Sequence, residues 1–276
     1  MHTPGDPPDQ PPDPGIGPGP VPEVPEVEVG VLGPVVVRGA ARPFTRVSSR
    51  ELVVYLVMHP GGAGTDQWAT ALWPDGAVAA STLHSTASVA RRALGRSRLG
   101  HDHLPRRHGR LRLETTVTSD WARLAVLARS EDPAAWLRGL DLVRGRPFEG
   151  LRCPDWAVLE GVAAEVEETI VMLAIRAADH LLDAGDGQGA ARAARRGLPA
   201  APYDERLHRR LLRAADVQGN PAGVETAMAR LLHLLAGDGP LAGDGPGPLV
   251  DLVHPETAEL YRALSRHGTR GSLARL

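Results

Sequence analysis

Valines alternate with other residues from position 27 to position 31, and Gly33-Pro34 separates this run from a second apolar run at 35–38. Alternation with a period of two, interrupted by turn residues, is typical of short strands with one buried face. The pattern predicts a β-hairpin or a pair of short strands over residues 27–38.

Three helices are predicted next. Ser48 and Glu51 have the spacing of a capping box in front of the apolar run 52–58. Periodicity alone also allows a buried strand there, and the cap favours a helix. Thr65 is the expected N-cap of a short second helix that stops before a proline. The third helix is predicted at 81–94, where the apolar stripe consists of Leu83, Ala87, Ala90 and Leu94.

A basic hairpin is predicted after the third helix. Residues 104–106 and 111–113 flank the sequence Arg-His-Gly-Arg at 107–110. Two short runs around a glycine-containing turn are typical of a β-ribbon. Strands, three helices and a basic hairpin are together the elements of a winged helix-turn-helix.

From about residue 120 the pattern changes to successive helices. Apolar residues three or four positions apart predict one long helix, and its stripe consists of Leu159, Val162, Val166, Ile170, Leu173, Ala177 and Leu181. Gly185 and Gly219 lie in turns 34 residues apart, and Asp132-Pro133-Ala134 resembles Asn220-Pro221-Ala222. A 34-residue repeat of paired helices is the tetratricopeptide pattern, although two turns could share this spacing by chance. A last helix is expected at 255–266.

Proline and glycine mark two segments outside this pattern. Residues 1–26 contain ten prolines and few large apolar side chains, which predicts a disordered spacer, with a proline-rich ligand segment as the alternative. A near-duplicate Gly-Asp-Gly-Pro predicts a flexible loop at 237–248. The expected division is a linker at 1–26, a winged helix at 27–116 and an all-α tetratricopeptide-like domain at 117–276. The fold class is mainly α with a small β component.

Charge is distributed unevenly along the chain. Residues 27–115 hold 12 Arg against six acids, a balance of +6, whereas the whole chain has a net charge of −2. A basic block in a near-neutral chain indicates an anionic partner. Because the chain contains no lysine, a P-loop and Schiff-base chemistry are excluded. No catalytic constellation is present, so we expect neither an enzyme nor a cofactor.

The candidates for metal binding and nucleophilic chemistry are weaker than the basic block. His101, Asp102, His103 and His108 offer ligand atoms, but a solvated loop is favoured over a metal site. Cys153 is the only cysteine, so an internal disulfide is excluded and inert packing is expected. His208 is expected on the surface of its helix. No apolar run approaches the roughly 18 residues of a membrane span, and a cytoplasmic location without membrane insertion is expected.

Several short runs in the chain resemble one family, the bacterial transcriptional activator domain proteins, which include the SARP-type regulators. The similarity extends in order over residues 27–267. The runs that carry it are Val31-Leu32-Gly33-Pro34, Ala71-Leu72-Trp73-Pro74-Asp75, Arg91-Arg92-Ala93-Leu94-Gly95, Phe148-Glu149-Gly150-Leu151 with Trp156, and 204–212. The resemblance implies an OmpR-like winged helix followed by a tetratricopeptide-like domain. It also implies activation of transcription by a protein that binds promoter DNA, usually as a dimer.

The expected DNA-contacting residues lie on the third helix, opposite its apolar stripe, and on the basic hairpin. They are Ser81, His84, Ser85, Ser88, Val89, Arg91 and Arg92 of the helix, and Arg106, Arg107 and Arg110 of the hairpin. Family members commonly carry a basic residue where Val89 stands, so one expected cation is replaced here by an apolar side chain.

Two hypotheses follow from these observations. The first is a transcriptional regulator, an activator, that binds double-stranded DNA through the winged helix. Its helical domain would then form a homodimer or contact RNA polymerase or another protein. The alternative is a non-catalytic protein-interaction module with a degenerate winged helix. The basic block favours the first hypothesis and Val89 favours the second.

Overall fold

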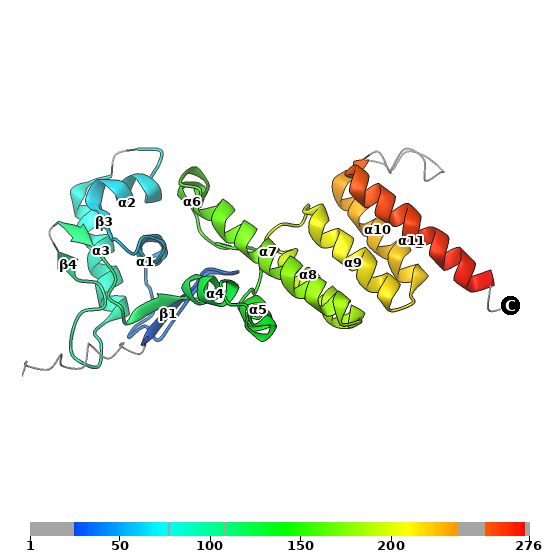
Figure 1. Ribbon diagram of the computed structural model, residues 1–276. Coiled ribbons are helices and arrows are strands. Elements are labelled where there is room, and N and C mark those ends of the chain that lie inside the picture. The colour runs from blue at the N-terminus through cyan, green and yellow to red at the C-terminus, as the bar shows by residue number, and fades with distance from the viewer. Residues whose placement is uncertain (1–24, 77, 108, 237–251, 274–276) are drawn as a thin grey trace, which may run out of the picture.

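The computed structural model describes residues 25–76, 78–107, 109–236 and 252–273. An N-terminal part of small sheets and three helices is followed by an elongated array of helices (Figure 1). Most of the predicted linker at 1–26, the loop predicted at 237–248, and His108 lie outside the described residues.

The first sheet has three short strands. β1 (Val27–Gly30) lies between β2 (Val36–Arg38) and β6 (Val117–Ser119), antiparallel to β2 and parallel to β6. Val27 and Val29 are buried in the core, as the alternation requires. The predicted hairpin is confirmed, and a strand that follows the third helix by more than 20 residues completes its sheet.

Three helices follow in the chain: α1 (Val47–Met58), α2 (Thr65–Leu72) and α3 (Ala80–Leu94). α1 packs against β1 and β6 of this sheet, and α2 and α3 pack against α1. The predicted capping box of α1 is wrong, because the helix begins one residue before Ser48. The Ser48 hydroxyl lies 3.4 Å from the Thr86 hydroxyl of α3, and Glu51 is buried. Both side chains therefore serve tertiary contacts instead of the helix end. The predicted cap of α2 is also displaced, since Gly64 is its N-cap and Thr65 its first helical residue.

A second sheet contains the predicted basic hairpin. β4 (Arg106–Arg107) and β5 (Arg110–Leu111) are antiparallel, and β5 also pairs with β3 (Ala63–Gly64), in the order β3-β5-β4. Gly109 in the turn has a φ of 78°, in the left-handed region that a tight hairpin turn requires. The β4–β5 hairpin is the wing, and with α1, α2 and α3 it completes a winged helix.

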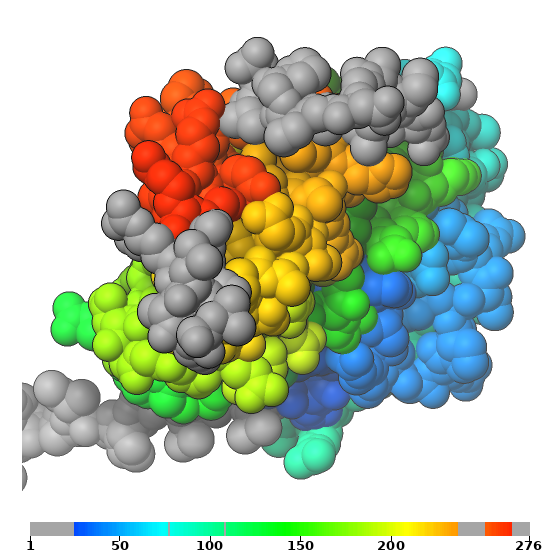
Figure 2. Space-filling view, turned by 90° about the vertical axis from the view of Figure 1, so that its right-hand side faces the viewer, coloured from blue at the N-terminus to red at the C-terminus, as the bar shows by residue number. Residues whose placement is uncertain are grey.

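The remaining helices form the helical array, and short turns connect α4 to α5, α7 to α8 and α9 to α10. Its elements are α4 (Asp120–Ala128), α5 (Pro133–Leu140), α6 (Asp155–Leu159), α7 (Val162–Asp183), α8 (Gly187–Gly197), α9 (Glu205–Val217), α10 (Pro221–Ala236) and α11 (Pro255–Leu273). Gly185 and Gly219 have φ angles of 75° and 62°, which confirms the two predicted turns. Seen from its C-terminal end, the array shows α11 against α10 and α9 (Figure 2).

The long predicted helix is in fact two helices. Gly161 has a φ of 76° and separates α6 from α7. Leu159 therefore leaves the predicted stripe and is 84% exposed, while Val166, Ile170 and Leu173 are buried. The helical period of the apolar residues is correct, but the predicted helix extends past Gly161, which separates α6 from α7.

The winged helix and the helical array are joined by buried polar contacts. Asp120, at the start of α4, is 2% exposed. It accepts hydrogen bonds from the backbone N–H groups of Val31 at 2.7 Å and Leu32 at 3.2 Å, and from Arg144 Nη2 at 3.0 Å. Arg144 Nη1 also donates to the carbonyl of Pro34 at 2.8 Å.

A second set of contacts ties α1 to the segment before α7. Glu51 is 3% exposed and accepts hydrogen bonds from the backbone N–H of Arg152 at 2.7 Å and its Nη2 at 3.3 Å. The Tyr55 hydroxyl donates to Glu160 Oε1 at 3.2 Å, and His59 Nε2 lies 2.7 Å from Glu160 Oε2. We refer to these contacts and those of Asp120 as the junction.

Candidate nucleic-acid interface

The outward face of α3 is polar and carries no carboxylate. Ser81, His84, Ser88 and Arg92 are exposed, whereas Thr86, Ala90, Ala93 and Leu94 are buried on the opposite face. Of the other predicted contact residues, Ser85, Val89 and Arg91 are half-buried. Val89 therefore lies on the flank of the exposed face and not at its centre.

Two arginines make hydrogen bonds at the edges of the exposed face of α3. Arg46, the residue before α1, reaches across and donates from Nη1 to Ser85 Oγ at 2.7 Å. Arg91 donates from Nε to the carbonyl of Leu104 at 2.9 Å, in the segment that leads into the wing. Sequence reasoning missed Arg46, because only the folded chain brings the start of α1 beside α3.

The three predicted arginines of the wing differ in their contacts. Arg107 Nη2 forms an ion pair with Glu114 at 2.7 Å, and Arg110 Nη2 donates to the carbonyl of Gly62 at 2.7 Å. Arg106 is exposed, and within the described residues its side chain has no hydrogen-bond or ion-pair partner. Arg106 thus retains the full hydrogen-bonding capacity of its guanidinium for a ligand.

Three further arginines of the winged helix are exposed and unpaired within the described residues. Their side chains are exposed and, as far as the structure describes the chain, make no hydrogen bond or ion pair; they are Arg42, Arg98 and Arg112. The charge count at 27–115 includes them, but the sequence gives no sign of which arginines are left unpaired by the fold.

A cavity of about 270 Å³ lies between α3 and the wing. The lining residues come from α2, α3, β4 and β5 and are Thr65, Trp68, Leu83, His84, Ala87, Arg91, Arg106 and Leu111. The floor is aliphatic, and each polar side chain in the lining can donate a hydrogen bond. This cavity brings predicted residues of the helix and the wing into one place.

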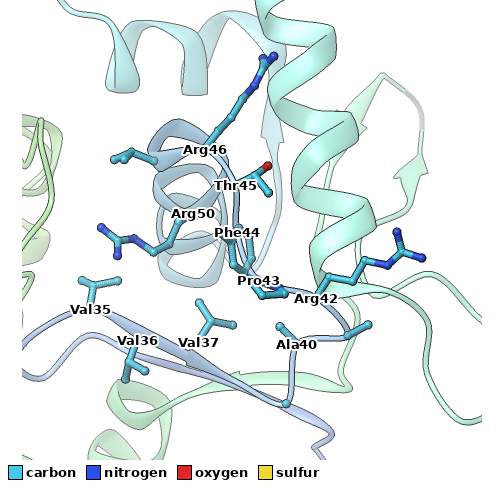
Figure 3. Close-up of a pocket in the computed structure, with 13 residues that line it drawn as sticks. Val35, Val36, Val37, Ala40, Arg42, Pro43, Phe44, Thr45, Arg46 and Arg50 are labelled. Carbon is cyan, nitrogen blue, oxygen red and sulfur yellow. The ribbon is translucent and has the colours of Figure 1, made fainter.

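A larger cavity, of about 510 Å³, lies between β2 and the start of α1. Arg42, Arg46 and Arg50 line it together with valines of β2. Figure 3 shows their three guanidinium groups pointing in different directions, away from one another. Because the charges do not converge on a common point, this cavity is not an anion site.

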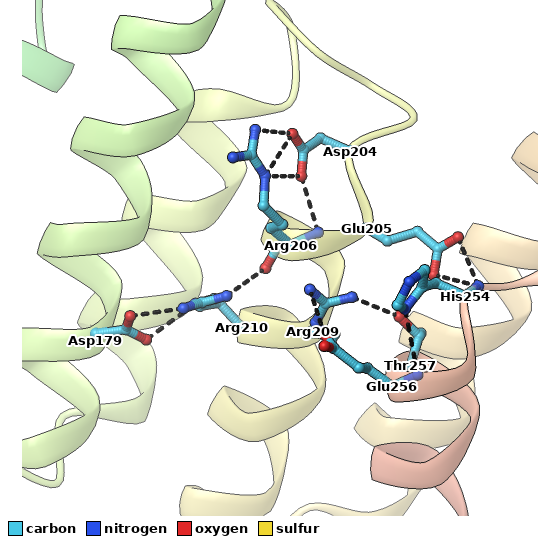
Figure 4. Close-up of polar contacts among 9 residues, drawn as sticks. All are labelled: Asp179, Asp204, Glu205, Arg206, Arg209, Arg210, His254, Glu256 and Thr257. Atoms are coloured by element: carbon cyan, nitrogen blue, oxygen red, sulfur yellow. Dashed lines mark hydrogen bonds and ion pairs between the residues drawn. The ribbon is translucent and has the colours of Figure 1, made fainter.

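Charged side chains in the helical array pair with one another. Arg206 binds Asp204 and Glu168, and its hydrogen bonds lower the pKa of Glu168 below the ordinary value. Burial alone raises the pKa of Asp204, but the hydrogen bonds and charge of Arg206 lower it overall. Arg210 pairs with Asp179 of α7 at 2.7 Å, which ties α9 to its neighbour (Figure 4).

Two predictions about histidines are wrong. His208 is 2% exposed and lies with Nε2 2.8 Å from the carbonyl of Pro202, and burial lowers its pKa. His103 is also buried, with Nδ1 2.8 Å from the Thr116 hydroxyl, so it does not belong to a solvated loop. Contacts remote in sequence bury both rings.

The predicted metal candidates do not form a cluster. Asp102 is paired with Arg96 at 3.0 Å, and the described residues contain no group of three His, Cys, Asp or Glu side chains placed to hold a metal ion. Cys153 is a half-buried free thiol. Among the helices that the structure describes, none has the length and apolarity to cross a membrane.

Comparison with known proteins finds a similarity in the helical array and a similar fold. Residues 114–239 match the family model of the bacterial transcriptional activator domain. A structure of Mycobacterium tuberculosis EmbR in complex with a low-affinity phosphopeptide has the same fold, with a TM-score of 0.58 and 22% sequence identity. The alignment covers 90% of this chain and 70% of the EmbR chain. None of the curated proteins matches the chain.

Residues 114–239 are therefore similar to a bacterial transcriptional activator domain. The likeness to the EmbR structure shows the fold, in which a winged helix is followed by a helical array.

Proposed function

We propose that this chain is a transcriptional regulator, that it binds double-stranded DNA with α3 in the major groove and the wing on the adjacent backbone, and that it activates transcription. The observation that carries the proposal is the surface made by α3 and the wing. It combines exposed serines, Arg92 and Arg106, which has no partner within the described residues, and α3 contains no acidic residue. Phosphates are contacted mainly by such arginine and serine side chains.

Base discrimination on this surface rests on few groups. Serine hydroxyls accept or donate and so discriminate weakly between bases, whereas arginine can bind guanine with two hydrogen bonds. Arg92 is exposed on α3 and is the residue we assign to guanine recognition. Most of the affinity then comes from phosphate contacts and is strongly salt-dependent.

The test is binding of the full chain to genomic DNA fragments, followed by measurement of affinity against salt concentration for the enriched sequence. Arg106→Ala should weaken binding to all sequences and reduce the slope of log K against log salt by roughly one unit. Arg262→Ala, on the distant α11, is the matched control and should leave the slope unchanged. No binding to any duplex at low salt would contradict the proposal.

The second candidate function is a protein-interaction module in which the winged helix no longer reads DNA. Val89 favours it, because an apolar side chain occupies the flank of the proposed reading face. Val89→Arg distinguishes the two functions. An added cation should tighten DNA binding about tenfold if α3 enters a groove, and should have no effect if it does not.

We propose that the helical array contacts RNA polymerase or another protein. We also propose that the chain forms a homodimer on DNA. We retain residue 117 as the start of this domain, although β6 completes the first sheet. Sedimentation of the chain with and without the enriched duplex tests the dimer. A single protomer per duplex would contradict it.

A further inference from the structure

The cavity between α3 and the wing has the chemistry of a site for a phosphoryl group. Its polar lining consists of Thr65, Trp68, His84, Arg91 and Arg106, and no carboxylate lines it. Each of these side chains has at least one N–H or O–H that can donate to an oxygen. The volume, about 270 Å³, accommodates a tetrahedral anion with part of its substituents.

The indole of Trp68 is an independent indication of a ligand. Trp68 is 2% exposed, and within the described residues its Nε1 is buried without a hydrogen-bond partner. Buried polar groups are nearly always hydrogen-bonded, so this donor, on a residue that lines the cavity, is available to an acceptor that the described residues do not supply. An oxygen of a bound anion is such an acceptor.

Backbone geometry adds to the positive potential of the cavity. Thr65 is the first residue of α2, whose N-terminal N–H groups carry a partial positive charge. One of the flanking groups, the Gly64 N–H, is already bonded to the Gln67 side chain at 2.9 Å. The only acidic side chain of that turn, Asp66, is exposed and does not line the cavity.

The two arginines that line the cavity come from different elements. Arg91 lies on α3, and its bond to the Leu104 carbonyl fixes its guanidinium toward the segment that enters the wing. Arg106 is on β4 of the wing and is unpaired in the part of the chain that the structure describes. An anion in the cavity would therefore connect the helix to the wing.

We propose that this cavity holds one backbone phosphate of duplex DNA. The inference rests on the proposed function: with α3 in the major groove and the wing at the adjacent minor groove, the strand that separates the grooves crosses between these two elements. That strand presents its phosphate to Thr65, Trp68, Arg91 and Arg106 together. The phosphate fixes the angle between helix, wing and DNA.

The experiment measures the affinity of the full chain for its enriched duplex. Thr65→Val removes the hydroxyl with little change in volume, and Thr70→Val, an exposed position on α2, is its matched control. Thr65→Val should weaken binding about tenfold, as expected for a hydrogen bond to a charged group, and Thr70→Val should not. Arg106→Ala should remove a contact with the same phosphate as Thr65→Val does, whereas Arg112→Ala should leave the contacts of that phosphate intact.

Duplexes with a single neutral methylphosphonate identify that phosphate. At one backbone position the modification should weaken binding and also abolish the difference between the native chain and Thr65→Val. At every other position the difference should persist. A Thr65→Val effect that no single phosphate removes would overturn the proposal.

The indole N–H resonance of Trp68 provides a readout of the site in the native chain. The chain has five tryptophans, and Trp68→Phe assigns the resonance. Duplex DNA should move it downfield, as a new hydrogen bond requires. If inorganic phosphate at millimolar concentration moves it and DNA does not, the site takes a free anion and the proposal of a DNA phosphate is wrong.

The two proposals fail in different ways. No duplex binding at low salt contradicts the proposed function. Normal DNA binding, with Thr65→Val equal to Thr70→Val and an unmoved Trp68 resonance, overturns only the phosphate site.

Discussion

Arginines on the two sides of the winged helix differ in what they bind. At the junction, Arg144 and Arg152 pair with Asp120 and Glu51, whose side chains are nearly fully buried. On the outer side, formed by the outward face of α3 and by the wing, Arg106 has no partner within the described residues. The same residue type stabilises the fold at the junction, whereas on the outer side an arginine such as Arg106 is left available.

The difference follows from the cost of burying charge. A buried carboxylate must be paired and hydrogen-bonded, so its arginine is committed to the fold. An exposed arginine gains little from a surface ion pair and can remain unpaired without penalty. The pairing of an arginine therefore distinguishes structural cations from those available to a phosphate, which the charge of +6 over residues 27–115 cannot do.

The strongest test of this comparison is Asp120→Ala at the junction. The change leaves Arg144 and two backbone N–H groups, of Val31 and Leu32, without an acceptor. We expect a loss of about 3–5 kcal/mol in the free energy of unfolding, measured in urea. Asp120→Asn, which keeps one acceptor oxygen, should lose less. A loss below about 1 kcal/mol for Asp120→Ala would show that the junction is not a structural tie.

The next largest effect is expected at Tyr55. Burial, then the charge of Glu160 and the hydrogen bond to it, raise the pKa of Tyr55 from 10.0 to about 12. Because the folded pKa is the higher, the stabilising contribution is complete below pH 10 and is lost as pH rises from 10 to 12. The loss approaches about 2 kcal/mol. Urea unfolding between pH 8 and 11.5 measures it, and Tyr55→Phe should remove this alkaline dependence.

How far the fold can be predicted from the sequence depends on the range of the contacts. The turns at Gly185 and Gly219 and the wing hairpin follow local rules of backbone conformation, and the structure confirms them. The predictions of a cap at Ser48 and of a surface position for His208 are wrong. Ser48 contacts Thr86 of another helix, and His208 is buried in the interior of the array. Local signals do not report contacts between distant segments.

The candidate site shows the same limit. Helical periodicity indicates which side of α3 faces outward, since burial of Ala90 and Leu94 fixes the rotation of the helix. It does not indicate that Arg107 and Arg110 of the wing have partners, nor that Arg106 has none among the residues that the structure describes. Pairing depends on positions brought together only by the folded chain.

A smaller effect on stability is expected at His208. Its ring is buried, as the junction carboxylates are, but it has no ion-pair partner among the described residues. Burial lowers its pKa below the ordinary value of 6.5. Its neutral form is favoured by folding, so the contribution to stability is complete above pH 6.5 and is lost as pH falls through the folded pKa. The free energy of unfolding should decrease from pH 7 to pH 5, and His208→Gln should reduce this dependence. An equal dependence in the variant would contradict the assignment.

The smallest effect on stability is expected on the outer side. Arg106→Ala combined with Arg112→Ala removes two exposed guanidinium groups that stabilise nothing within the described structure. The free energy of unfolding should therefore change by no more than about 0.5 kcal/mol. The same double variant should bind DNA more weakly, and its salt slope should fall by roughly one unit for each phosphate that the chain no longer neutralises. Parallel urea and DNA titrations measure both effects. A large loss of stability would mean that these arginines belong to the fold, as those of the junction do, and would remove the distinction between the two sides.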